Sequence, residues 1–182
     1  PEQETIWQRK QYAKPGLGRW LWNRRDELAL NLVRPSDRTV LDIGAGEGIT
    51  LEKMQQRFPA RNILGIDSQL ENVRICRQCG CRVQQGDLYH LPVRQQCIDI
   101  VFLMEVIEHL TRPELAIREI HRVLAPRGRL VIVFPNDSVF KLARLMTLRF
   151  REAMYDPGHV RQWTPRAIRN LLHEHGFAIT YS

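Results

Sequence analysis

The sequence predicts an α/β protein in which a doubly wound, mostly parallel sheet carries helices on both faces. Two observations predict this fold. Short apolar runs alternate with amphipathic helical stretches along the chain, and the first run ends in an acid followed by a glycine turn, Asp42-Ile43-Gly44-Ala45-Gly46-Glu47-Gly48. Alternating strand and helix patterns are typical of parallel sheets covered by helices. The length of 182 residues predicts a single domain.

The expected elements follow from periodicity and from turn residues. A helical segment over residues 5–33, broken at Pro15-Gly16, precedes the first strand. Apolar runs predict six strands, at Thr39–Ile43, Asn62–Ile66, Arg82–Gln84, Ile98–Leu103, Arg129–Phe134 and Phe177–Tyr181. Helical spacing predicts helices at Ile49–Phe58, Leu70–Gln78, Glu114–Leu124, Lys141–Arg151 and Pro165–His175, the last with Thr164 as its N-cap and Gly176 at its end.

The glycine turn predicts a ligand that lies against bare backbone. Gly44, Gly46 and Gly48 carry no side chains, and we expect the N–H groups at the start of the next helix to face the ligand as well. The third glycine comes one place too early for a dinucleotide fingerprint, and no Gly-Lys-Ser/Thr of a P-loop occurs. Asp42 would repel a pyrophosphate, and suits a ligand that carries an ammonium or sulfonium charge.

Composition and charge limit the class of protein. The chain has 27 basic and 20 acidic residues, a net charge of +7, which permits nucleic acid, an anionic membrane surface or an acidic substrate as partner, or an arginine-rich solvated surface. No apolar run is long enough to span a membrane and the first residues are polar, so we expect a cytoplasmic protein. The Cys76-x-x-Cys79-x-Cys81 pattern suggests zinc, but Cys76 also fits a helix core, with Gly80 ending that helix and the thiols reduced.

Three acids leave three consecutive strands. Asp42 ends the first, Asp67 ends the second, and Asp87 follows the third. Because parallel sheets bind ligands beyond the carboxyl ends of their strands, these carboxylates are expected at one edge. A carboxylate such as Asp67 suits the two hydroxyls of a ribose, and Asp87 suits the amine of adenine. We expect the binding residues to be Asp42, Gly44, Ala45, Gly46, Asp67, Ser68, Gly86, Asp87, Leu88 and Met104, with apolar Ile66, Leu88 and Met104 around the adenine ring.

These motifs resemble class I S-adenosylmethionine (SAM)-dependent methyltransferases, and are similar to the methyltransferases of ubiquinone and menaquinone biosynthesis. The order and spacing match over residues 37–136, and residues 159–177 are similar too. The resemblance implies a Rossmann-like domain at 37–182, SAM as cofactor, Asp67 at its ribose and Asp87 at its adenine. It also implies that the helical segment 1–36 covers the cleft. The seventh, antiparallel strand of that family has no counterpart before Ser182, which leaves the oligomeric state open.

The acceptor side is expected just after the fourth strand. In a helical turn, Glu105, Glu108 and His109 would share one face, which makes His109 a candidate general base for a hydroxyl acceptor. The same residues could instead hold a divalent metal with His159, similar to metal-assisted methyltransferases, or could simply hydrogen-bond the loop.

The function expected from the sequence is methyl transfer to a small-molecule hydroxyl or carbon, on a quinone-like or lipid-like acceptor. Residues 136–163 are apolar and basic and would form a lid over the cleft that suits an anionic acceptor or a membrane surface. An RNA 2′-hydroxyl methyltransferase with metal assistance and a SAM-binding regulator without turnover are the alternatives.

Overall fold

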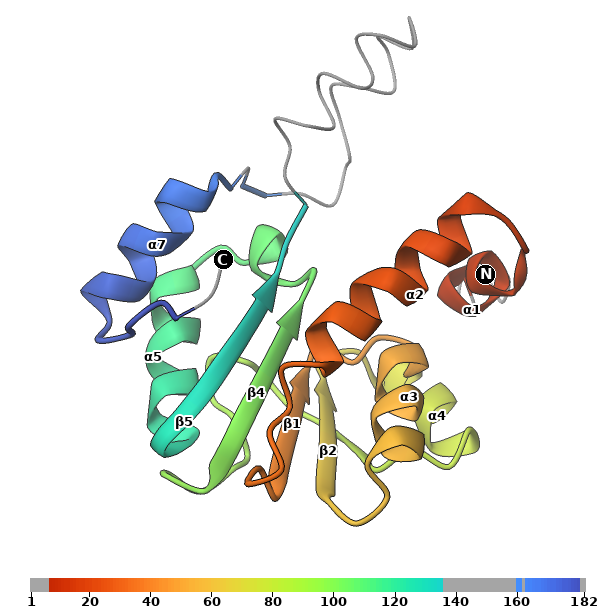
Figure 1. Cartoon of the computed structure of the whole chain (residues 1–182), viewed down its shortest axis with the longest axis horizontal. Helices are drawn as coiled ribbons and strands as arrows, with labels where there is room; N and C mark the ends of the chain where they lie inside the picture. Colours follow the sequence, from red (N-terminus) through yellow and green to blue (C-terminus); the bar gives the residue numbers. More distant parts are fainter. Residues whose placement is uncertain (1–6, 136–159, 162, 181–182) are drawn as a thin grey trace, which may run out of the picture.

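The computed structural model describes residues 7–135, 160–161 and 163–180, and within them one five-stranded parallel sheet forms the centre of the molecule (Figure 1). The strand order is β3-β2-β1-β4-β5, and every neighbouring pair is parallel. The strands are β1 (Thr39–Ile43), β2 (Asn62–Asp67), β3 (Val83–Gln85), β4 (Ile98–Met104) and β5 (Leu124–Val133). The predicted parallel sheet is therefore confirmed.

Helices cover both faces of the sheet, as Figure 1 shows. Helices α3 (Ile49–Arg57) and α4 (Leu70–Gln78) lie on one face, and α5 (Pro113–Val123) and α7 (Pro165–Glu174) lie on the other. Each face has its own apolar core, because successive strand residues point to opposite sides: Val40 belongs to the α3 side and Leu41 to the α5 side. Asp42 therefore points to the same side as Val40, toward α3.

The strand order places a binding edge at the carboxyl end of β1. The chain leaves β1 toward β2 on one side, and later returns to β4 on the other side. Connections that leave in opposite directions open a crevice above the sheet at this switch point. Asp42 of β1 pairs with Gly65 of β2 and Phe102 of β4, so the ends of the three strands lie side by side.

Two helices precede the sheet, α1 (Trp7–Ala13) and α2 (Leu17–Leu30). The predicted break between them is confirmed at Gly16, whose φ of +134° is a conformation that favours glycine. In Figure 1, α2 runs outward from the edge of the sheet and α1 lies at its far end. Only the C-terminal part of α2 enters the core, through Ala29 and Leu30.

The residues before the strand predicted at Arg129–Phe134, Pro126-Arg127-Gly128, have the composition of a turn but are part of β5. The strand begins at Leu124, and its register with β4 shifts between Ile98 and Ile100. Arg127 has a φ of +67°, and a Cβ on Gly128 would lie 2.9 Å from the carbonyl oxygen of Ile98. These residues make a bulge within the strand, which a pattern of turn residues does not distinguish from a loop.

The predicted sixth strand at Phe177–Tyr181 is wrong for the residues that the structure describes. Residues 177–180 form no strand, and the N–H of Phe177 donates to Leu172 O of α7 (3.0 Å). The Phe177 ring lies edge-on to His121 of α5, with 5.3 Å between ring centroids. Phe177 therefore packs on α5 and α7 rather than on the edge of β5, while residues 178–180 are exposed.

The other helices agree with their predictions to within about two residues, a normal uncertainty for helix ends. Thr164 caps α7 by accepting from Ala167 N (3.2 Å), and Gly176 follows with a φ of +82°. The predicted helix Lys141–Arg151 lies outside the described residues, as does the expected lid at 136–163 apart from residues 160, 161 and 163. Among the described helices, none is long and apolar enough to cross a membrane.

Candidate active site

The glycine turn after β1 is held against the end of β2. The N–H groups of Gly44 and Ala45 both donate to Ile66 O, at 2.8 and 3.1 Å. Gly44 has a φ of +73°, and a Cβ on it would lie 2.4 Å from Val106 Cγ2. Glycine is therefore required at this position both by its backbone conformation and by its contact with the loop after β4.

The N–H groups of the turn are used within the protein. Gly46 N donates to Asp67 Oδ2 at 2.8 Å, Glu47 N to Gln8 Oε1 at 3.1 Å, and Gly48 N to Ala45 O at 3.0 Å. Residues 44–48 thus differ from an open phosphate-binding loop, whose N–H groups point at the ligand. The glycines therefore allow close contact with the backbone, but the hydrogen-bonded N–H groups of Gly46, Glu47 and Gly48 are not free to bind an anion.

Asp67, the last residue of β2, has a carboxylate fixed by three donors. Oδ2 accepts from Gly46 N, and Oδ1 accepts from Gln69 N (2.9 Å) and Asn72 Nδ2 (3.1 Å). The residue is only 7% exposed. Each carboxylate oxygen can accept more than one hydrogen bond, so the group is oriented and keeps the capacity to accept from a ligand.

Asp42 is a buried acidic residue, and no basic residue of the described part of the chain forms an ion pair with it. It is 3% exposed, and burial raises its pKa to about 7, helped by the negative charges of Asp26 and Asp67 and opposed by Arg25. A cation brought next to Asp42 would favour its ionised form. The turn is therefore electrostatically prepared for a positively charged ligand.

Asp87, Gly86 and Ser68 line one cavity of about 340 Å³ together with Gln85. Asp87 is exposed, and its Oδ1 accepts from Tyr89 N at 2.9 Å. A Cβ on Gly86 would lie 3.0 Å from Ile66 Cγ2, so the β3 loop lies close to the end of β2. Three of the residues predicted for the adenosine portion thus come together. Leu88 and Met104 are both buried but belong to different core clusters, so the structure does not bring them to one ring.

The segment after β4 differs from its prediction. Ile107–His109 is a single turn of 3₁₀ helix, η1, and Glu105 precedes it with a φ of +55°. Glu108 is buried at 2% exposure, whereas Glu105 and His109 are exposed. The expected shared face of Glu105, Glu108 and His109 is therefore wrong, because this turn is not α-helical and the buried acid points away from the exposed pair.

Glu108 binds the chain segment before α7 through its backbone. Its carbonyl oxygen accepts from Val160 N (3.0 Å) and Arg161 N (3.1 Å), and Ile107 O accepts from Trp163 Nε1 at 3.1 Å. Within the described residues, no three histidine, cysteine or acidic side chains are grouped to hold a metal ion. His159, the fourth predicted ligand, lies outside the described residues. Cys76 is buried in α4, as its core prediction required.

Comparison with known families identifies the cofactor of this chain. A family model described as a methyltransferase domain matches residues 17–182. The chain belongs to this family of SAM-dependent methyltransferase domains. S-adenosylmethionine is the cofactor that membership implies, in agreement with the prediction from the glycine turn and the three acids.

Relatives and solved structures agree with this membership. A probable SAM-dependent methyltransferase of Mycolicibacterium smegmatis is 30% identical over 170 residues, covering 91% of this chain and 63% of that protein. Demethylmenaquinone methyltransferase of Thermus thermophilus is 26% identical over 184 residues, covering 88% and 82%. The crystal structure of YcgJ protein from Bacillus subtilis superposes with a TM-score of 0.67 at 27% identity, covering 86% of this chain and 69% of that one. The chain spans less than two thirds of the first curated relatives it matches.

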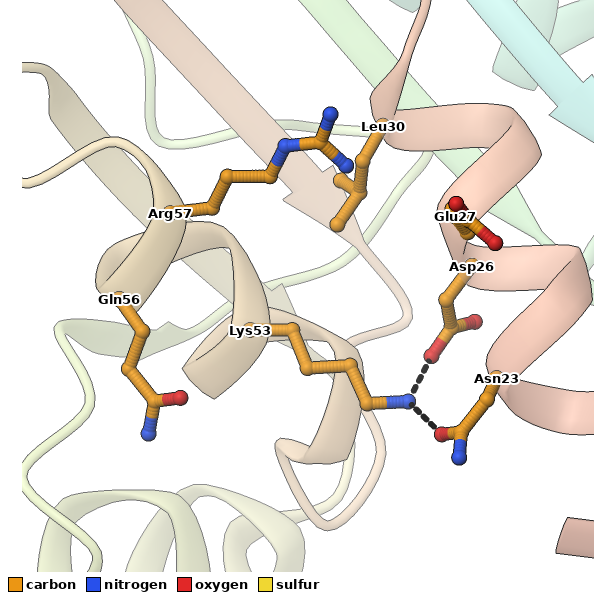
Figure 2. A pocket seen from close by; sticks show the side chains of 7 residues that line it. All are labelled: Asn23, Asp26, Glu27, Leu30, Lys53, Gln56 and Arg57. Carbon is orange, nitrogen blue, oxygen red and sulfur yellow. Dashed lines mark hydrogen bonds and ion pairs between the residues drawn. The ribbon is translucent and has the colours of Figure 1, made fainter. Parts of the chain in front are cut away.

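Charged contacts between the N-terminal helices and the residues near this edge were missed from the sequence. Asp26 of α2 is 1% exposed and binds Arg25 (2.7 Å) and Lys53 Nζ (2.6 Å), as Figure 2 shows for Lys53, and Arg25 also reaches Glu105 Oε2 at 3.1 Å. The groove between α2 and α3 drawn there has a volume of about 490 Å³. The signal in the sequence that could have indicated these contacts was an acidic residue, Asp26, in the part of α2 that enters the core.

Helix α1 lies directly on the glycine turn. The backbone N–H groups of Gln8 and Arg9, in its first turn, donate to the carboxylate of Glu47 at 2.9 and 2.7 Å. Arg9 also donates to Glu47 O at 2.9 Å and pairs with Glu52 at 2.7 Å. A carboxylate at a helix N-terminus is favoured by the helix dipole, so Glu47 is a docking point for α1.

Proposed function

We propose that this chain transfers the methyl group of SAM to a small-molecule acceptor. The observation that carries the proposal is the fixed carboxylate of Asp67, held between the glycine turn and α4 beside the cavity of Ser68, Gly86 and Asp87. The donor set fits the cofactor, because SAM offers two ribose hydroxyls, an adenine amine and a positively charged amino-acid tail. A cavity of this volume lies within the usual range for bound small molecules.

Each acid has a separate role in the proposal. Asp67 accepts from the ribose hydroxyls, and Asp87 accepts from the adenine amine through the oxygen that Tyr89 N leaves available. Asp42 lies near the charged tail, where a cation opposes the like charges of Asp26 and Asp67. Ser68, Gly86 and Leu88 shape the adenosine side, and Gly44, Ala45 and Gly46 form the floor next to the tail. Met104 lies at the end of β4, between the cofactor edge and the acceptor side.

When bound, SAM supplies an activated methyl group on a sulfonium, so the protein mainly needs to align the acceptor with it. A carbon acceptor needs little acid–base help from the chain. A hydroxyl acceptor needs its proton removed, and the exposed imidazole of His109, just after β4, is the group we assign to that role. We also propose that α1 and α2 cover the cofactor cleft, since α1 docks on Glu47 and α2 reaches Glu105 through Arg25.

A small molecule is the acceptor class we favour. The relative from Thermus thermophilus named demethylmenaquinone methyltransferase aligns over most of both chains, which supports a quinone-like or lipid-like acceptor. The net charge of +7 favours RNA as the second candidate. Metal assistance is no part of this proposal, because the predicted carboxylates do not share a face.

Calorimetric titration with S-adenosylhomocysteine tests the cofactor site. Asp67→Asn should raise Kd about 10–100-fold, equivalent to about 1.4–2.8 kcal/mol, because one charged acceptor for the ribose is lost. Asp99→Asn is the matched control: Asp99 also accepts from two backbone amides, those of Arg38 and Thr39, but at the amino end of β4. Equal affinity of the Asp67 variant and the wild type would refute the proposed ribose contact.

A turnover assay distinguishes an enzyme from a regulator that binds SAM without catalysis. Incubation with radiolabelled SAM and fractionated cell extract should give labelled small molecules, whereas cofactor binding without any labelled product would favour a regulator. Labelled RNA, with retention that falls steeply as salt rises, would support the second candidate acceptor.

A further inference from the structure

Exposed apolar side chains are concentrated on the N-terminal helices. Nine large apolar residues of the described chain are exposed, and five of them lie in α1 and α2. The other four are spread over separate parts of the fold. Single exposed apolar residues are common on protein surfaces, but a cluster on one element indicates an interaction surface.

Four of the five form one stripe along α2. Leu17, Trp20, Leu21 and Leu28 are 71%, 59%, 53% and 50% exposed. Their positions i, i+3, i+4 and i+11 fall on one side of an α-helix, and Arg24 at i+7 lies among them. We name these five residues the outer face of α2.

The opposite side of α2 is turned toward the protein. Asp26, Ala29 and Leu30 are its buried residues. The helix thus buries a charged residue and exposes its bulkier apolar residues, which reverses the usual arrangement of a surface helix.

Buried polar contacts fix this orientation. Asp26 accepts from Lys53 Nζ at 2.6 Å, from Thr50 Oγ1 at 3.2 Å and from Arg25. Figure 2 shows Lys53 reaching across from α3 to Asp26 and Asn23. Rolling α2 to bury its outer face would break these bonds and leave charges unpaired, so the apolar stripe stays outward.

We infer that the outer face of α2 docks on an anionic lipid surface. Leucine and tryptophan on one helix side, with arginine and lysine beside them, are typical of helices that lie in the membrane interface. Residues 7–30 carry six basic and two acidic residues, a net charge of +4 by subtraction, within a chain of net charge +7. Each basic residue near an anionic leaflet adds attraction.

The same charges disfavour a second copy of the chain as the occupant. Two chains meeting through this stripe would bring two basic helices together. Four apolar side chains on one helix also offer less than the roughly 800 Å² per partner of a stable protein interface. An anionic lipid surface satisfies both the charge and the shape of the outer face.

Docking would place the cleft close to the lipid. The C-terminal end of α2 enters the sheet edge, and Arg25 on this helix contacts Glu105 after β4. An acceptor dissolved in the membrane would then reach the site without crossing water. This consequence for the acceptor rests on the proposed function, whereas the docking itself does not.

Co-sedimentation with vesicles tests the docking. The chain should bind phosphatidylcholine vesicles that contain phosphatidylglycerol, and binding should weaken in high salt and without the anionic lipid. The variant Leu17→Ser/Trp20→Ser/Leu21→Ser/Leu28→Ser should lose at least about tenfold in partitioning. The matched control Leu70→Ser/Leu115→Ser/Ile179→Ser, which also replaces exposed apolar residues, should bind like the wild type.

Two further readouts keep the test independent of folding and of the proposed function. Circular dichroism and thermal unfolding show whether the outer-face variant is folded, and quenching of Trp20 by brominated lipids, lost in Trp20→Phe, reports insertion without multiple substitutions. Equal partitioning of the outer-face and control variants would overturn the inference. So would a wild-type dimer in light scattering that this variant abolishes, combined with no binding to vesicles.

Discussion

The proposed cofactor half and the proposed acceptor half of the sheet edge are built differently. In the cofactor half, at the ends of β1 to β3, Asp67 accepts three hydrogen bonds and Asp42 is almost fully buried. In the acceptor half, after β4, Glu105 and His109 are exposed, and Glu105 meets Arg25 from a different part of the chain. One half is preorganised by hydrogen bonds that fix a buried carboxylate, whereas the other presents exposed groups, one of which pairs with a residue distant in the chain.

This difference matches what each half has to recognise. A cofactor common to a family can be met by carboxylates that neighbouring strands orient in advance, which lowers the cost of binding. An acceptor differs between relatives, so its half gains from exposed groups on loops that a rigid scaffold positions. Substitutions in the cofactor half should therefore change affinity and stability, and those in the acceptor half should change turnover.

Asp42→Asn should give the largest effect. The raised pKa of Asp42, about 7, means that the folded chain keeps a proton that the unfolded chain releases near pH 4, so stability falls as pH rises from about 4 to about 7. The asparagine variant lacks this fall, and its advantage in urea unfolding should grow by up to about 4 kcal/mol between pH 4 and pH 8. A constant difference across this range would contradict the burial of an ionisable Asp42.

Cofactor affinity offers a second measurement at this residue. If Asp42 faces the positive tail, SAM binds best when it is ionised, and wild-type affinity should rise by up to about tenfold per pH unit below pH 7. Above that pH the affinity should level off. The asparagine variant should bind more weakly, with a much smaller pH dependence.

Gly44→Ala should have the next largest effect. Alanine would have to adopt a φ of +73°, and its Cβ would lie 2.4 Å from Val106 Cγ2 in the loop after β4. We expect a loss of about 3 kcal/mol in unfolding free energy, from backbone strain and overpacking. Gly18→Ala is the control, since no atom lies within 4 Å of its Cβ position in helix α2; it should gain about 0.5–1 kcal/mol. Similar stability of the two variants would show that the turn tolerates a side chain.

His109→Asn should have the smallest effect on the cofactor half. Because the residue is exposed on the short turn η1, unfolding free energy should change by about 0.5 kcal/mol or less, and affinity for S-adenosylhomocysteine should stay within about twofold. Methylation of a hydroxyl acceptor should fall about 100-fold if His109 removes its proton. Glu105→Gln serves as the neighbouring control, and an equal loss in both variants would indicate positioning of the loop instead of base catalysis.

The strand ends that carry Asp42, the glycine turn and Asp67 could be predicted from the sequence because their signals are local. The run into Asp42, the glycines after it and Asp67 at the next strand end each follow from a few adjacent residues, and parallel pairing brings them together. The proposed acceptor half was harder to predict from the sequence. Whether Glu105, Glu108 and His109 share a face depends on one turn being α-helical. The structure has a 3₁₀ turn there, and its Ile107 O accepts from Trp163 Nε1, a residue far away in the chain.

The sequence by itself determined the alternation of strands and helices, the break at Gly16 and the order of the three acids, because periodicity and turn chemistry act over a few residues. Tertiary structure decided how the N–H groups of the turn are used, that Phe177 packs on helices instead of starting a strand, and that Asp26 faces inward while Leu17 and Trp20 face outward. The reason is physical: the side that a helix buries is chosen by partners far away in the chain. Here Lys53 and Thr50 of α3 bind Asp26, and no pattern within α2 contains them.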